Sequence, residues 1–199
     1  AENKSNSAFL GYWKFGISVA AAIALLLYLF NGNPNSATAT TIKSLLGSVK
    51  IIQQNGNELM NPKVGTSISI GSTIETVSMG SFVELEFHDQ SIVTLSDLSQ
   101  CVILRYDSNY RELRLLKGKF TSDIKTKPNK PPFKVYTPSF SLNVLEAKFD
   151  IDTMEEFSHL RAEKGKVQLT RLSDNQSEEV SENQEIFFSD GQVSSLLNL

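Results

Sequence analysis

Residues 83–89 read VELEFHD, and in this stretch apolar and polar side chains alternate one by one. Successive side chains of a β-strand point to opposite faces, so the stretch predicts a strand that is buried on one face only. The buried face is expected to hold Val83, Leu85 and Phe87, and the exposed face Glu84, Glu86 and His88.

Short runs of the same kind fill the chain after Thr41, from GSVKIIQ at residues 47–53 to EIFFS at residues 185–189. Gly, Pro, Asn, Asp or Ser residues separate these runs, and apolar residues at helical spacing are rare. Many short strands at close intervals are typical of all-β folds. We therefore expect an all-β domain over residues 42–199, built as a sandwich or as a solenoid-like fold.

A local pattern recurs in this region: a glycine, one polar residue, and then a β-branched or aromatic residue. It begins at Gly47, Gly118, Gly165 and Gly191. Glycine adopts positive φ angles without strain, so each copy predicts a tight turn just before a strand. The gaps between the copies are unequal, which excludes a tandem repeat of fixed period.

The N-terminal part of the chain has a different character. Residues 15–30 carry no charge, and a helix from Leu10 to Phe30 would be about 31 Å long, enough to cross a bilayer. Lys4 and Lys14 precede this run, which favours a cytoplasmic N-terminus. We expect a cytoplasmic tail over residues 1–10, a transmembrane helix over 11–30 and a polar linker over 31–41. A cleaved signal peptide is the alternative, because residues 37–39 read ATA.

Small side chains recur every four residues in the expected span, at Gly16, Ala20 and Ala24. Such a face lets two transmembrane helices approach closely, either in two copies of this chain or with a different membrane subunit. Alanine as a tolerated apolar filler explains the pattern equally well. Helix packing at these positions is therefore a hypothesis for substitution experiments.

The order of the strand-like runs resembles the FecR-type domain, named for the regulator of ferric citrate uptake. The resemblance covers about residues 42–193 and rests on GSVKIIQQNG at 47–56, the long run at 64–99, LRLLKGKF at 113–120, residues 133–152 and RAEKGKVQLTR at 161–171. It implies an extracytoplasmic all-β domain in the periplasm, anchored in the inner membrane of a bacterium.

The chain departs from the family pattern at two points. It has Asp89-Gln90-Ser91 where the family tends to write Asp-Gly-Ser, so a permissive turn residue is lost. Sensor members of the family carry a long cytoplasmic segment that binds a sigma factor, whereas only about ten residues precede the expected span here. A tail of that length cannot form a folded module. The resemblance thus implies a divergent member with a very short cytoplasmic tail.

Residues with catalytic chemistry are few. The net charge of −3 excludes broad electrostatic capture of nucleic acid, and Cys101, the single cysteine, lies in an apolar run that predicts an inert core thiol. Glu84, Glu86 and Asp89 form the best carboxylate group, although a solvated strand face explains them more simply. Neither His88 nor His159 has a metal-spaced partner. We expect no catalytic, cofactor-binding or metal site, and the sequence does not indicate a small ligand.

Residues 123–134, DIKTKPNKPPFK, combine four lysines with three prolines. The lysines are Lys125, Lys127, Lys130 and Lys134. A stiff basic loop could bind an acidic partner or an anionic polymer in the envelope. A solvated connector whose prolines prevent edge pairing is the simpler interpretation.

The sequence thus predicts a non-catalytic, membrane-anchored interaction or scaffold module in a complex of envelope proteins. The alternative is a transmembrane signal-relay protein of the FecR regulator type, which would act on a sigma factor. An envelope hydrolase that uses Glu84 or Glu86 is a weaker third hypothesis.

Overall fold

The computed structural model describes residues 37–125, 129–154, 157–189 and 192–198. Residues 37–199 form one compact unit that is distinct from residues 1–36. The expected tail, the span over 11–30 and its small residues Gly16, Ala20 and Ala24 lie outside the described residues. None of the described ranges holds a helix with the length and hydrophobicity that a membrane span requires.

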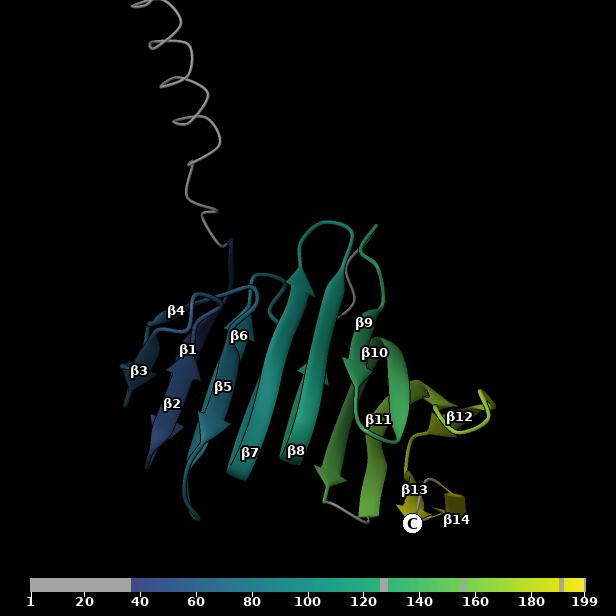
Figure 1. Cartoon of the computed structure of the whole chain (residues 1–199). Helices are drawn as coiled ribbons and strands as arrows, with labels where there is room; N and C mark the ends of the chain where they lie inside the picture. The colour runs from purple at the N-terminus through teal and green to yellow at the C-terminus, as the bar shows by residue number, and fades with distance from the viewer. Residues whose placement is uncertain (1–36, 126–128, 155–156, 190–191, 199) are drawn as a thin grey trace, which may run out of the picture. The chain divides into compact units, whose positions relative to one another are not determined.

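The described region is all-β, as the sequence predicts, and contains 14 strands (Figure 1). They are β1 (Thr38–Leu46), β2 (Val49–Ile52), β3 (Glu58–Met60), β4 (Ser67–Ser69), β5 (Thr73–Thr76), β6 (Phe82–Phe87), β7 (Ile92–Tyr106), β8 (Arg111–Ile124), β9 (Phe133–Tyr136), β10 (Phe140–Thr153), β11 (Phe157–Arg171), β12 (Ser177–Ser181), β13 (Gln184–Ser189) and β14 (Gln192–Asn198). β1 begins at Thr38, within the segment that the sequence analysis assigned to the linker, because Ala39 and Thr40 are already fully buried.

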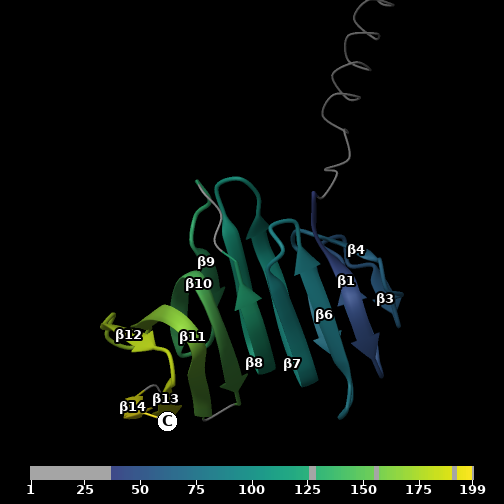
Figure 2. The same ribbon diagram turned by 180° about the vertical axis from the view of Figure 1, so that it is seen from behind.

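Hydrogen bonds join all the strands into one continuous sheet that folds back on itself into two layers. The front layer of Figure 1 holds β3, β2, β5, β9, β12 and one half each of β7, β8, β10 and β11. The back layer, seen in Figure 2, holds β4, β1, β6, β13, β14 and the other halves of the four long strands. The sequence predicted either a sandwich or a solenoid-like fold. The strand pairing is that of a sandwich in which four long strands bend from one layer into the other.

The core lies between the two layers. The side chains of residues 82–88 alternate between inward and outward positions, as the sequence predicts. Val83, Leu85 and Phe87 are at most 2% exposed, whereas the side chains between them lie outward. Phe149 and Ile151 of β10 are buried as well, and they face Ala162 and Leu160 of β11. The KVQL segment at residues 166–169 of β11 pairs with the first half of β10.

The recurring glycines have the positive φ angles that the sequence predicts, at 74° for Gly47, 91° for Gly118 and 77° for Gly165. Only Gly47 lies in a turn between strands. Gly118 and Gly165 lie inside β8 and β11, where the register shifts and the strand bends from one layer into the other. The prediction of a turn was wrong at these two positions, because a β-bulge needs the same backbone angle. Gly191 lies outside the described residues.

Candidate functional site

A buried polar cluster closes one end of the sandwich, at the end where the hairpin between β7 and β8 turns. Asp89 follows β6, Tyr106 ends β7 and Arg111 begins β8. The Asp89 Oδ2 atom accepts hydrogen bonds from the Tyr106 hydroxyl at 2.7 Å and from Arg111 Nη1 at 2.8 Å. All three side chains are at most 8% exposed, so three separate segments meet in one ion-paired cluster.

Arg111 also holds the loop that joins β8 to β9. Its Nε donates to the carbonyl of Pro131 at 2.8 Å, and its Nη1 lies 3.2 Å from the carbonyl of Lys125. The backbone N–H of Lys125 in turn donates to Ser91 Oγ at 3.1 Å. Because a buried guanidinium must satisfy several N–H donors, Arg111 fixes both ends of this loop.

Burial alone would raise the pKa of the Asp89 carboxyl, but the hydrogen bonds from Tyr106 and Arg111 outweigh it and hold that pKa below the ordinary value. The same burial, with the Asp89 carboxylate beside it, raises the pKa of Tyr106. The carboxylate is therefore ionised and the phenol protonated at neutral pH. Both oxygens of the carboxylate accept hydrogen bonds, since Oδ1 bonds the N–H of Ser91. This arrangement fits an anchor better than an acid or base.

Aromatic rings pack beneath the cluster. The rings of Phe87 and Tyr106 stack at 4.4 Å between centroids, and Phe133 meets Phe87 edge to face at 6.0 Å. The Arg111 guanidinium lies 5.8 Å from the centre of the Phe133 ring. These contacts exclude water from the ion pair, which strengthens it. Above the cluster lies a cleft of about 250 Å³ that His88, Asp107 and Lys130 also line.

Neither Tyr106 nor Arg111 was predicted as a site residue from the sequence. A signal was present, because Arg111, Leu113 and Leu115 alternate on one face of a strand. A charged residue in a buried alternation needs a buried counter-charge. Gln90, at the departure from Asp-Gly-Ser, has φ 68° and so adopts the glycine-like angle at a cost in strain.

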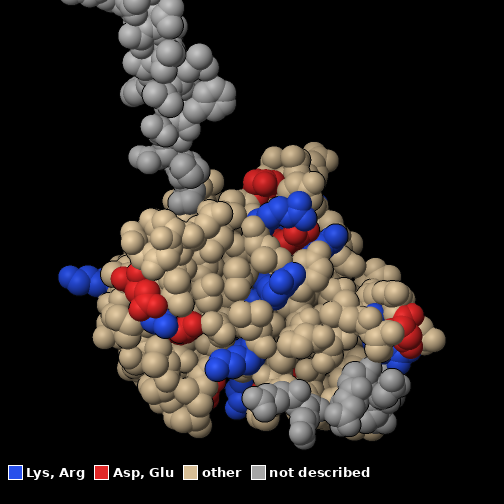
Figure 3. All heavy atoms as spheres, viewed as in Figure 1, with Lys and Arg blue, Asp and Glu red and all other residues tan. Residues whose placement is uncertain are grey.

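The three described lysines of the proposed partner contact lie at different places on the domain. Lys125 Nζ pairs with Asp123 Oδ1 at 2.8 Å, on the outer side of the back layer. Lys130 is exposed beside the cleft, and Lys134 lies on the outer side of β9 in the front layer. Lys127 lies outside the described residues. On the front face, most Lys and Arg side chains lie beside Asp or Glu side chains in small groups, with uncharged surface between the groups (Figure 3).

The other candidate residues lie apart from the cluster. Glu84 and Glu86 point outward from β6, and Glu84 pairs with Lys43 at 3.3 Å, so Asp89 does not share their face. His159 Nε2 lies 3.0 Å from Glu185 Oε2 on the outer face of β11. In the described part of the chain, no group of three metal-ligand side chains comes together. Cys101 is fully buried, as predicted, and burial raises the pKa of its thiol to about 12.

The middle of the chain is similar in sequence to a known protein family. Residues 72–168 match the family described as FecR protein. This segment is a FecR domain. The match runs from just before β5 into β11, so it includes the bent strands β7, β8 and β10 and the whole Asp89–Tyr106–Arg111 cluster.

Two crystal structures of a candidate anti-sigma factor from Parabacteroides distasonis have a similar fold. Their TM-scores are 0.56 and 0.54, at 18% and 19% sequence identity. Each comparison covers 63% of this chain and 59% of the other, so this chain spans about three fifths of their length. At this identity the likeness concerns the fold alone. No curated protein sequence matches the chain.

Proposed function

We propose that this chain is a regulatory protein that relays a signal by binding other proteins, which was the alternative in the sequence analysis. The FecR domain carries this proposal, and the likeness in fold to candidate anti-sigma factors supports it. A sigma factor, or the receptor that controls one, is then the expected partner. The scaffold hypothesis assumes the same kind of binding surface but finds less support in these relatives.

We propose further that the protein binds without catalysing a reaction. The Asp89 carboxylate accepts three hydrogen bonds and is buried, so it has no free position for a substrate proton. Glu84 is held by Lys43 on an outer face of the sandwich. Replacing Glu84 and Glu86 with glutamine should leave regulation intact, and loss of a measurable hydrolytic activity in this variant would contradict the proposal.

The compartment is part of the proposal. The apolar residues 15–30 and the lysines before them support an anchor in the inner membrane, with the β domain in the periplasm. If the small-residue face of the span packs against another helix, Gly16→Leu with Ala20→Leu should change the set of co-purifying membrane proteins while insertion is retained. An unchanged set would mean that the span is an anchor only.

Affinity purification of the whole chain from its native membranes in mild detergent tests the function. We expect a sigma factor or an outer-membrane receptor in stoichiometric amount, identified by mass spectrometry. Deleting the gene should also change the transcription of a defined set of genes, and the wild-type chain should restore it. Structural envelope proteins as the only stoichiometric partners, with unchanged transcription, would support the scaffold instead.

A further inference from the structure

A second recess lies at the other end of the sandwich from the polar cluster, where β7 and β8 bend in the middle of their length. Its volume is about 400 Å³. Four segments meet there: the turn before β6, the bulge of β7, the bend of β8 and the end of β10. We call it the bend notch, and it is lined by Met79, Asp97, Leu98, Lys117, Gly118, Lys119, Asp152, Thr153 and Met154.

The apolar side chains of the bend notch are unusually exposed. Met79 is 74% exposed, Met154 59% and Leu98 47%. Methionine side chains are flexible and polarisable, and they adapt to different apolar partners. Large apolar side chains gathered at a recess mark a surface where another molecule binds.

The backbone at the bend notch holds two successive residues at left-handed angles. β7 has two extra residues between Ser96 and Gln100 relative to β8, and both Asp97 (φ 46°) and Leu98 (φ 57°) adopt left-handed angles. Asp97 is explained locally, because Oδ1 accepts the N–H of Gly80 at 2.7 Å. The apolar side chain of Leu98 cannot form a hydrogen bond of this kind, and it lines the notch. Strain of this kind persists mainly at functional sites.

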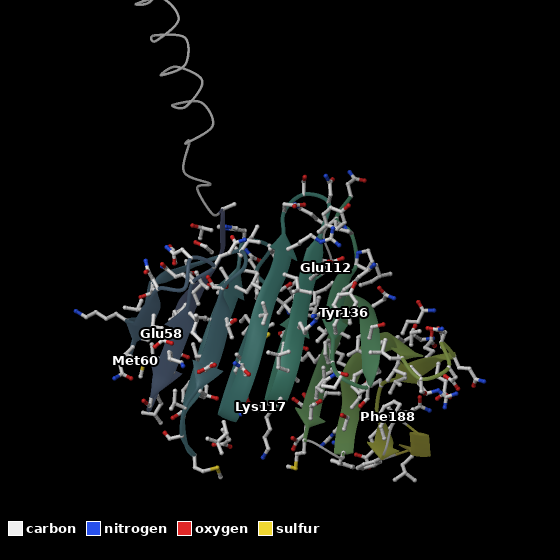
Figure 4. All side chains as sticks on the ribbon, viewed as in Figure 1. Glu58, Met60, Glu112, Lys117, Tyr136 and Phe188 are labelled. Carbon is white, nitrogen blue, oxygen red and sulfur yellow. The ribbon has the colours of Figure 1, made fainter. Side chains whose placement is uncertain are left out.

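Polar groups at the rim indicate the charge of the partner. Lys117 and Lys119 line the notch, and neither makes an ion pair with any residue that the structure describes. Figure 4 shows Lys117 extending from the bend of β8, away from the sheet. Asp152 lies opposite Lys119 across the β8–β10 ladder, and its Oδ1 is buried without a hydrogen-bond partner in the described chain. The notch thus offers two cations without an ion pair in the described chain, beside two aspartates, of which Asp97 accepts the N–H of Gly80.

We propose that the bend notch binds an acidic amphipathic segment of a partner protein. An apolar side chain of the segment fills the space between Met79 and Met154, and its carboxylates meet Lys117 and Lys119. This inference rests on the proposed function, because it names the surface through which a regulatory partner is bound.

Photo-crosslinking tests the identity of the bound segment. A photoreactive phenylalanine derivative replaces Met79 in the whole chain in its native membrane, and mass spectrometry identifies the crosslinked peptide. We expect a peptide of another protein in which an apolar residue stands between acidic ones. Crosslinks only to lipid, to a second copy of this chain, to a basic segment or to nothing would each overturn the proposal.

Charge reversal tests the role of the lysines. A labelled synthetic copy of the crosslinked segment should bind Lys117→Glu with Lys119→Glu at least about tenfold more weakly than the wild-type chain in fluorescence anisotropy. The matched control is Lys63→Glu with Lys164→Glu, two exposed lysines that do not line the notch. Equal affinity of the wild-type chain and the notch variant would overturn the proposal.

Removal of the apolar lining gives a second, independent readout. Met79→Ser with Met154→Ser should weaken binding of the same peptide, whereas Val64→Ser with Leu145→Ser, which are also exposed, should not. Circular dichroism spectra that match the wild type show that each variant is folded. If a regulator co-purifies with the wild type but crosslinks elsewhere, the notch proposal fails and the proposed function stands. If no regulator co-purifies, the proposed function itself fails.

Discussion

Gly118, at the bend of β8, allows a test of why this sandwich needs glycine inside a strand. A Cβ atom at this position would lie 2.5 Å from the backbone Cα of Ser99 in β7. Gly56 is a matched control, because its φ of 84° is close to the 91° of Gly118 but a Cβ there would meet nothing within 4 Å. Alanine at both positions separates the cost of the angle from the cost of the contact.

The expected magnitudes follow from these two geometries. Alanine at a left-handed angle costs about 1 to 2 kcal/mol, and this should be the whole effect of Gly56→Ala. In Gly118→Ala the two strands must also move apart by about 1 Å to reach ordinary contact, at an overpacking cost of about 1 to 3 kcal/mol. The movement breaks the 2.7 Å hydrogen bond from the N–H of Lys119 to Ser99 Oγ, which adds about 1 kcal/mol.

We therefore expect Gly118→Ala to destabilise the domain by about 2 to 4 kcal/mol more than Gly56→Ala. Urea unfolding of the whole chain in mild detergent, followed by far-ultraviolet circular dichroism, measures the free energy of unfolding of each variant. Equal losses in the two variants would refute the reasoning, because the close approach of β7 and β8 would then contribute nothing. A loss confined to Gly56→Ala would refute it as well.

Three further predictions use the same unfolding measurement. Phe149→Ala should cost about 3 kcal/mol or more, since the side chain is fully buried; a change near zero would remove Phe149 from the core. Gln90→Gly should stabilise the domain by about 1 kcal/mol, because it relieves a left-handed angle, and a loss of stability would show that the glutamine side chain matters more. The pKa of Asp89 is lower in the folded state, so its charge stabilises the fold above the ordinary pKa of 3.8 and this contribution is lost as pH falls through the lowered folded value. Wild type and Asp89→Asn should therefore differ in stability by a constant amount above about pH 4 and converge at more acidic pH; a difference independent of pH would contradict this.

The polar cluster illustrates where sequence reasoning was limited. Asp89 stood beside Glu84 and Glu86 in the sequence, and the three carboxylates were grouped for that reason. The turn after β6 carries Asp89 into the core, while the two glutamates stay outside. Its partner Arg111 lies 22 residues further along the chain. Such a pairing depends on how hairpins stack, which no local pattern specifies.

Four features could be predicted from the sequence alone: the all-β class, the buried face of β6, the inert thiol of Cys101 and the positive φ angles of Gly47, Gly118 and Gly165. These features follow from side-chain alternation and local backbone sterics, which act over a few residues. Three features depend on the packing of distant segments: the bends of single strands at Gly118 and Gly165, the ion pair of Arg111 with Asp89, and the bend notch. A bend and a turn need the same local angle, so the choice between them depends on which distant strand lies alongside, and therefore on the packing of the whole domain.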